Sequence, residues 1–239
     1  MTADFMSRFG WPAGLRPPLG IGHRGASAHA TENTLEAFSR AATLGAEMWE
    51  LDTQLTSDGV CVVNHDDHLL RVFGLDRHVS LLTAAELAAL PGAAVPTFGQ
   101  VAALARATGS GLYVELKAPG TGILAWRELE AHDQPFAVLG SFNTGMVREL
   151  RDAGCPYALS ILVPLGADPH AAADAAKADI IHLCWERGGQ RPQDLVTTDL
   201  LDRARHAGRQ IVLWHEERPA VLADLVEQWC WGSARMNRS

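Results

Sequence analysis

The stretch at residues 111–141 reads GLYVELKAPGTGILAWRELEAHDQPFAVLGS. Its two short apolar runs, Gly111–Leu116 and Ala137–Ser141, have the length and continuity of strands that are covered on both faces. Between them, Ile123–His132 carries apolar residues at helical spacing. A strand, a helix and a second strand in this order predict a right-handed βαβ unit, and therefore a parallel sheet with helices packed against it.

The same alternation continues along most of the 239 residues. The other predicted strands are Leu19–Gly22, Met48–Gln54, Val60–His65, Tyr157–Val163, Asp179–Cys184 and Gln210–Trp214. The other predicted helices are Glu32–Leu44 with Thr31 as its N-cap, Thr97–Ala107, Thr144–Ala153, Pro169–Lys177, Thr198–His206 and Arg218–Gln228.

Counting these units favours an α/β fold of the (β/α)8 TIM-barrel type. The runs Met48–Gln54 and Val60–His65 are separated only by a turn at Ser57-Asp58-Gly59, so we interpret them as one bent strand-and-turn feature. Seven strands and seven helices then precede the end of the chain, and one barrel typically needs about 250 residues. The glycine-rich motifs of nucleotide-binding open sheets are missing after the strands.

We predict a single domain over residues 1–239, with a small insertion at Asp66–Val95 that carries one helix around Thr83–Leu90. The tail at residues 229–239 reads WCWGSARMNRS, in which two Trp and a Cys are followed by polar residues. This is a poor sequence for a barrel strand, so we expect the last strand to be atypical or missing. Without it, the edges of the first and seventh strands would lack a partner.

The composition excludes several classes of protein. The net charge is -8 and no run of Lys or Arg occurs, which argues against nucleic-acid binding and against a polybasic membrane patch. No apolar stretch is long enough to insert stably in a membrane. The chain starts without the basic and apolar segments of a signal peptide, and Cys61, Cys155, Cys184 and Cys230 form no metal-binding pair. These features predict a cytoplasmic protein with reduced thiols.

Ionisable residues lie at the carboxyl ends of the first predicted strands, where the active sites of barrels form. Glu50 and Asp52 share one face of their strand, as do Glu115 and Lys117, because side chains alternate. Carboxylates that converge inside a barrel would repel one another unless a cation lay between them. We therefore predict that Glu50, Asp52 and Glu115 hold a divalent metal, and their oxygen ligands suit Mg²⁺ or Ca²⁺ more than Zn²⁺.

Two histidines and two permanent cations complete the predicted site. His23 and His65, each at a strand end, could act as a paired acid and base, while Arg24 and Lys117 could neutralise phosphate oxygens. Taken singly, a strand-end histidine is more often structural and a carboxylate pair more often forms ion pairs. Their joint placement at one end of the barrel favours metal-dependent phosphoryl transfer, in which charge stabilisation dominates.

Eight segments carry a resemblance to a known family. They are His23-Arg24-Gly25, Glu32-Asn33-Thr34, Glu50-Leu51-Asp52, His65-Asp66 with Leu69 and Arg71, Thr83-Ala84-Ala85-Glu86-Leu87, Val95-Pro96-Thr97, Glu115-Leu116-Lys117 and Trp214 in Val212-Leu213-Trp214. At these positions, which span most of the chain, the sequence resembles the glycerophosphodiester phosphodiesterase family.

The resemblance implies an activity and assigns a role to each matching residue. Glu50, Asp52 and Glu115 would hold the metal, and His23 and His65 would be the catalytic acid and base. Arg24 and Lys117 would contact the phosphate, and Trp214 would line the glycerol site. The implied reaction is hydrolysis of a glycerophosphodiester to sn-glycerol 3-phosphate and an alcohol, with a neighbouring glycerol hydroxyl attacking phosphorus first.

The chain departs from the family pattern in three places. Thr31 stands where a proline is usual, and His215-Glu216-Glu217 follows Trp214 where Thr-Val-Asn is usual, so His215 or Glu216 could take over glycerol contacts. The third departure is the tail. Codons for Trp231–Arg238 can be chosen so that the frame two bases later encodes G-I-C-T-D-E-P, close to the family's last strand, which suggests a frameshift near Val226–Gln228.

Two alternatives to this function remain open. One is a lyase resembling phosphatidylinositol-specific phospholipase C, which would need an apolar rim facing the membrane that the sequence does not indicate. The other is a barrel that binds metal and a phosphodiester without turnover because its C-terminus is altered. Retained metal binding without hydrolysis would identify the second alternative.

Overall fold

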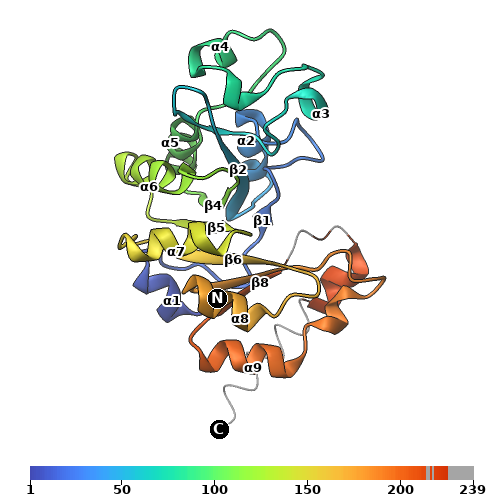
Figure 1. The fold of residues 1–239 in the computed structure, drawn as a ribbon. Helices are drawn as coiled ribbons and strands as arrows, with labels where there is room; N and C mark the ends of the chain where they lie inside the picture. Colours follow the sequence, from blue (N-terminus) through green and yellow to red (C-terminus); the bar gives the residue numbers. More distant parts are fainter. Residues whose placement is uncertain (214–215, 217, 226–239) are drawn as a thin grey trace.

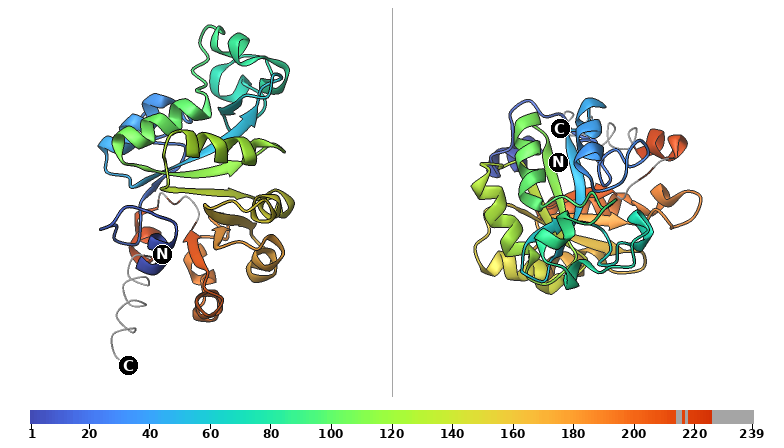
Figure 2. Two further views of the ribbon diagram at one scale, coloured as in Figure 1. Left: turned by 90° about the vertical axis from the view of Figure 1, so that its left-hand side faces the viewer. Right: turned by 90° about the horizontal axis from the view of Figure 1, so that it is seen from above.

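A computed structural model describes residues 1–213, 216 and 218–225 of the chain. Its sheet follows the path β1 (Ile21–Gly22), β2 (Met48–Leu55), β4 (Gly111–Leu116), β5 (Ala137–Ser141), β6 (Ala158–Pro164), β7 (Ile180–Cys184) and β8 (Gln210–Leu213). All neighbours on this path are parallel, and the sheet curls around its own axis (Figures 1 and 2). The fold is the predicted α/β TIM-barrel type. The predicted atypical tail at residues 229–239 lies outside the described residues.

The predicted strand-and-turn feature is a hairpin, in which the second run is a separate strand and not a continuation of the first. Strand β3 (Cys61–Val63) runs antiparallel to the end of β2, with Leu55 paired to Cys61. In the turn, the Thr56 hydroxyl donates to Asp58 at 2.6 Å, and Gly59 takes a positive φ of 79°. The hairpin returns the chain toward the sheet, directly before His65 and the insertion.

Helices follow the strands and cover the outer face of the sheet, as Figure 1 shows. They are α2 (Leu35–Thr43), α5 (Phe98–Thr108), α6 (Thr121–Ala131), α7 (Thr144–Asp152), α8 (Pro169–Ala176) and α9 (Thr198–His206). A short 3-10 helix, η2 (Pro192–Leu195), precedes α9. These bounds agree with the predicted helices to within a few residues. Of the helix predicted at Arg218–Gln228, residues 219–225 are helical, and the remainder after 225 lies outside the described residues.

The predicted start of the first barrel helix is wrong. Helix α2 is capped by Thr34, whose hydroxyl oxygen accepts from the Ala37 N–H at 3.2 Å, and not by Thr31. Asn33 has a φ of 58°, which is incompatible with the first turn of a right-handed helix. As a result, Glu32 and Asn33 lie in the loop before the helix, where their side chains are available to the site.

The core has two layers on the two faces of the sheet. Alternate strand residues such as Trp49, Leu51 and Val114 pack against the helices, whereas Met48 and Tyr113 point into the barrel. The inner layer also contains Phe5 from an unpredicted helix, α1 (Ala3–Arg8). The inner layer consists of Phe5, Met6, Trp11, Met48, Tyr113, Phe136, Val138, Ala158, Leu162, Ile180 and Val212.

The insertion contains α3 (Leu70–Phe73), a 3-10 helix η1 (Val79–Leu81) and α4 (Ala84–Ala88), of which only the last was predicted. Thr83 and Glu86 form a capping box at the start of α4. A separate small core holds the insertion together, made of Val62, Leu69, Val79 and Leu87. In Figure 1 the insertion projects beyond one end of the sheet. In the part of the chain that the structure describes, no helix combines the length and apolarity needed to cross a bilayer.

Candidate active site

Strand register brings the predicted metal ligands together. Asp52 on β2 is the direct partner of Glu115 on β4, and Glu50 lies one inward position before Asp52. On the other side of β2, Gly22 is paired with Trp49, so His23 and Arg24 follow beside Glu50. Because Met48 and Tyr113 face inward, the residues two and four positions later also face inward. The convergence therefore follows from parallel pairing and alternation alone.

The three carboxylates form a tight buried cluster. Each of Glu50, Asp52 and Glu115 is less than 10% exposed, and one oxygen from each lies within 4.8 Å of the others. Burial, followed by the neighbouring charges of Asp52 and Glu115, raises the pKa of Glu50 well above its usual value. Burial and the charge of Asp52 likewise raise the pKa of Glu115, although Lys117 opposes this. The cluster is thus an electrostatic conflict that a cation would relieve.

The loop after β1 turns sharply to present His23 and Arg24. His23 Nε2 lies 3.9 Å from Glu50 Oε2, and the Arg24 backbone N–H donates to the same oxygen at 3.0 Å. Arg24 has a φ of 55° and Gly25 a φ of 81°, and a Cβ on Gly25 would lie 2.7 Å from the Ala37 carbonyl carbon. Only glycine allows the loop to approach α2 this closely.

Asn33 fixes the central ligand, a role that sequence reasoning missed. Its side-chain amide donates to Asp52 Oδ2 at 2.9 Å, and its Oδ1 accepts from the Asp52 backbone N–H at 3.4 Å. The Arg24 guanidinium Nε lies 3.2 Å from the same Asp52 oxygen. Asn33 belongs to a motif segment, Glu32-Asn33-Thr34, but its expected place inside a helix concealed its function. Its left-handed backbone directs the amide to the strand.

Lys117 lies between the carboxylates and His65. Its ammonium is 2.8 Å from Glu115 Oε1, 3.4 Å from Asp52 Oδ1 and 3.1 Å from His65 Nε2. Burial alone would lower the pKa of Lys117, but the charges of Asp52 and Glu115 outweigh burial and raise it. The predicted residues His23, Arg24, Glu50, Asp52, His65, Glu115 and Lys117 are therefore all found in one cluster.

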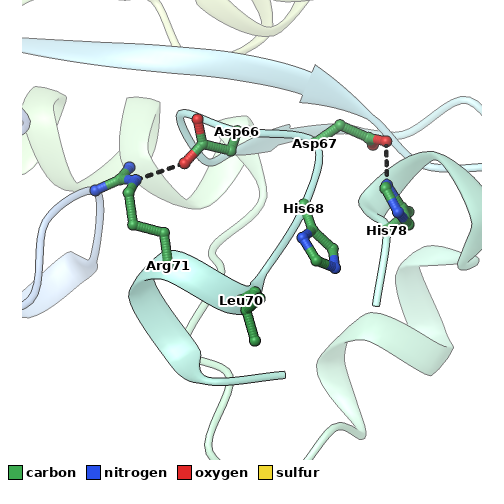
Figure 3. A pocket seen from close by; sticks show the side chains of 6 residues that line it. All are labelled: Asp66, Asp67, His68, Leu70, Arg71 and His78. Carbon is green, nitrogen blue, oxygen red and sulfur yellow. Dashed lines mark hydrogen bonds and ion pairs between the residues drawn. The ribbon is translucent and has the colours of Figure 1, made fainter. Parts of the chain in front are cut away.

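A surface pocket of about 490 Å³ adjoins this cluster on the insertion side. Figure 3 shows its lining, in which the Arg71 side chain reaches from α3 toward Asp66 and Asp67 faces His78. The His68 and His78 rings stack with centroids 4.5 Å apart. The lining residues are Asp66, Asp67, His68, Leu70, Arg71 and His78.

The predicted glycerol-side residues Trp214 and His215 lie outside the described residues. Glu216 is described, and its side chain is 4% exposed. Its Oε1 accepts from the Arg218 Nε at 2.7 Å and its Oε2 from the Arg218 Nη2 at 2.6 Å. Arg218 also donates to the Glu186 carbonyl, so Glu216 helps to join the loops after β7 and β8.

Comparisons of the sequence with known proteins point to one family. The model of the glycerophosphoryl diester phosphodiesterase family matches residues 23–232. Lysophospholipase D GDPD3 of Mus musculus is 46% identical over 65 residues, which are 27% of this chain and 20% of that protein. The glycerophosphodiester phosphodiesterase of Caldanaerobacter subterraneus is 46% identical over 69 residues, 29% of this chain and 28% of that protein. These matches span less than a third of either relative.

A solved structure resembles the fold over nearly its whole length. The phosphodiesterase of Oleispira antarctica, in complex with the product sn-glycerol-3-phosphate, has a TM-score of 0.75 and 23% identity. The match covers 88% of this chain and 90% of that one. At this identity the likeness concerns the fold.

Proposed function

The chain belongs to the glycerophosphoryl diester phosphodiesterase family, and from this premise we propose that it hydrolyses glycerophosphodiesters to sn-glycerol 3-phosphate and an alcohol. The observation that carries the proposal is the buried cluster of Glu50, Asp52 and Glu115, flanked by two histidines and two cations at the carboxyl ends of the strands. The proposal treats residues 1–239 as one domain and includes a cytoplasmic location. The location is supported by the free thiols of Cys61, Cys155 and Cys184.

The carboxylate cluster fits a divalent cation such as Mg²⁺ or Ca²⁺. Its oxygens lie close enough to share one ion, and all donors are hard. Burial and then the neighbouring carboxylates raise the pKa values of Glu50 and Glu115, and a positive charge would counter both effects. When bound, the cation supplies Lewis-acid stabilisation of negative charge on a phosphoryl oxygen. Glu50, Asp52 and Glu115 would hold it.

The remaining residues divide the work of binding and proton transfer. Arg24 and Lys117 lie on either side of Asp52, where each could bind a phosphate oxygen. His65 and His23 approach the cluster from different loops, so one could accept the proton of the attacking hydroxyl while the other protonates the departing alkoxide. Trp214 would line the glycerol site by resemblance.

Exposed apolar side chains favour a second candidate substrate. Leu70 and Leu81 in the insertion are 51% and 74% exposed, and Phe142 and Leu165, directly after β5 and β6, are 47% and 50% exposed. Phe142 and Leu165 lie at the carboxyl ends of parallel strands, where a substrate would enter, and Leu70 lines the pocket beside the site. An acyl chain on the glycerol, as in a lysophospholipid, would find apolar contacts there. Relative rates on lysophosphatidylcholine and glycerophosphocholine would decide between the two substrates.

The test of the proposed reaction is the release of glycerol 3-phosphate from glycerophosphocholine and glycerophosphoethanolamine, with Mg²⁺ or Ca²⁺ and with EDTA. We expect metal-dependent release that is lost in His23→Ala. His132→Ala is the matched control, because this histidine is paired with Glu128 on the outer helix α6. Calorimetric metal binding without release from any diester would contradict the proposal and identify a barrel that binds without turnover.

A further inference from the structure

Seven charged and ionisable side chains form a closed ring of contacts around the edge of the site. The ring joins residues from the β1 loop, the α2 loop, strands β2 and β4, and the insertion. In order of contact, it consists of His65, Asp66, Arg71, Glu32, Arg24, Asp52 and Lys117.

The outer half of the ring is centred on Arg71. His65 Nδ1 lies 2.7 Å from Asp66 Oδ1, and the Arg71 Nε donates to Asp66 Oδ2 at 2.6 Å. The two terminal nitrogens of Arg71 donate to the two oxygens of Glu32 at 2.9 and 2.7 Å. One guanidinium therefore holds two carboxylates with three of its nitrogens, which only arginine can do.

The inner half returns from Glu32 to His65 across the proposed metal ligand. Glu32 Oε1 accepts from the Arg24 Nη1 at 2.9 Å, and the Arg24 Nε lies 3.2 Å from Asp52 Oδ2. Lys117 Nζ lies 3.4 Å from Asp52 Oδ1 and 3.1 Å from His65 Nε2. From Asp66 round to Lys117 the six charged groups alternate in sign, and His65 closes the ring between Lys117 and Asp66.

This alternation fixes the tautomer of His65. An ammonium only donates, so the Nε2 of His65 must accept from Lys117, and the ring proton must reside on Nδ1. The ionised Asp66 accepts that proton's hydrogen bond, and the contacts of Asp66 with Arg71 and His65 outweigh burial and lower its pKa. The Nε2 lone pair, facing the cluster, is the one that can accept a proton.

We propose that Arg71 is a positioning residue for the reaction, acting on both sides of the site at once. Through Asp66 it fixes the tautomer and orientation of His65, and through Glu32 it holds the Arg24 guanidinium against Asp52. The inference rests on the proposed phosphodiesterase function and extends the site into the insertion. Arg71 itself touches none of the proposed metal ligands.

The competing explanation is that Arg71 only anchors the insertion to the barrel. Against it, the Arg71 side chain is 47% exposed, and solvent and salt screen ion pairs at such a place. The insertion also has its own buried anchor in Leu69 and Val79, which are fully buried. A bidentate arrangement in this solvated place is better explained by orientation than by stability.

The test compares Arg71→Gln, Arg71→Lys and a control, Arg77→Gln, in the full chain with Mg²⁺ or Ca²⁺. Arg77 lies in the same insertion, and its Nη1 donates to the Asp76 carbonyl at 2.8 Å. We expect Arg71→Gln to lower kcat by about 10- to 100-fold with KM changed less than about threefold, as for other residues that orient active-site groups. Arg71→Lys should recover only part of kcat, and Arg77→Gln should behave as wild type.

A second readout needs no substrate. Nitrogen-15 NMR of the imidazoles should show His65 as the Nδ1–H tautomer in wild type and a mixture of tautomers in Arg71→Gln, with unchanged thermal stability. A kcat loss no larger than in Arg77→Gln, or an unchanged His65 spectrum, would overturn the proposal. Inactivity of the wild type on every diester would count against the proposed function alone, since the NMR comparison would still decide the role of Arg71.

Discussion

The two halves of the barrel differ in what their strands present to the interior. Strands β1, β2 and β4 and their loops supply His23, Glu50, Asp52, Glu115 and Lys117. The inner positions of β5 to β8 are instead filled largely by small and apolar side chains, among them Val138, Ala158, Leu162, Ile180 and Val212. Within the described residues, chemistry and packing are thus separated along the chain. The second half therefore gives the polar cluster of the first half a packed apolar wall.

The largest expected effect comes from removing the central carboxylate of the first half. Asp52→Asn keeps the shape and the contact with Asn33 but removes the charge shared by Arg24 and Lys117. Loss of several kcal/mol of transition-state stabilisation should lower kcat/KM by at least about 10³-fold, with weaker metal binding by calorimetry. The matched change in the second half is Ser160→Ala, a buried residue that accepts from the Tyr113 hydroxyl. It should keep kcat/KM within about threefold of the wild type. Similar losses of kcat/KM in both variants would refute the division of the barrel into a polar first half and a packing second half.

The next effect tests the packing role of the second half. Leu159 on β6 is fully buried between the sheet and the helices, so Leu159→Ala should lower the free energy of unfolding by about 2–5 kcal/mol. Activity per folded molecule should be retained when the assay is run below the melting temperature. Titration with metal gives the concentration of intact sites by which the activity is divided. Leu222→Ala, on a 42% exposed residue, is the control and should be close to neutral. Loss of activity without loss of stability would move this strand into the catalytic half.

Sequence alone predicted the strands of the second half almost residue by residue, because buried parallel strands are short apolar runs bounded by helices. β5 and α9 have the predicted bounds, and the ends of β6 and β7 differ from the predicted ones by at most one residue. The elements that the sequence predicted wrongly belong to the first half, where contacts of the site override the local preference for helix or strand. Asn33 leaves the helix to bind Asp52, and the β2–β3 hairpin extends beyond the barrel to deliver His65.

The candidate ligands could be found from alternation and strand order, because Asp52 and Glu115 had to be neighbours once β2 and β4 were adjacent and parallel. The contacts of Glu32, Asp66 and Arg71 could not be found in this way. They join loops 39 residues apart in sequence through side-chain geometry, and no periodic pattern encodes such a distance. Helix α1 was not predicted because its six residues make fewer than two turns, too few to show a repeated apolar pattern.

A smaller effect is expected at the turn that positions His23 and Arg24. Gly25→Ala adds a methyl group at a positive φ of 81°, with the Ala37 backbone less than 3 Å away. The loop must shift, so we expect a loss of about 1–3 kcal/mol in stability together with a fall in kcat/KM. Gly74→Ala is the matched control, because Gly74 also has a positive φ but open space around its Cβ position. Equal effects at the two glycines would show that backbone strain, and not the approach to α2, is responsible.

The smallest expected effect is a gain in stability, whereas the changes above are losses, and it concerns the metal-free protein. The pKa of Glu50 is raised by burial and by the neighbouring carboxylates, so the folded state holds a proton that the unfolded state has already released. Stability should therefore fall as pH rises from about 4.5, the ordinary value for this residue, through the raised pKa. Glu50→Gln removes this penalty while its amide oxygen can still accept from the Arg24 N–H. In EDTA at neutral pH we expect the variant to melt a few degrees higher, since about 1 kcal/mol corresponds to roughly 2–4 °C in a chain of this size.

Added metal should reverse this order, because the wild type gains binding free energy that the variant lacks. Glu36→Gln on the exposed face of α2 is the control and should leave the melting temperature unchanged with or without metal. If Glu50→Gln melted below wild type in EDTA, the first half of the barrel would be stabilised by its carboxylates even without a cation. The contrast between a first half destabilised by its buried carboxylates and a well-packed second half would then be wrong. Lys117 and Arg24 would have to neutralise the cluster by themselves.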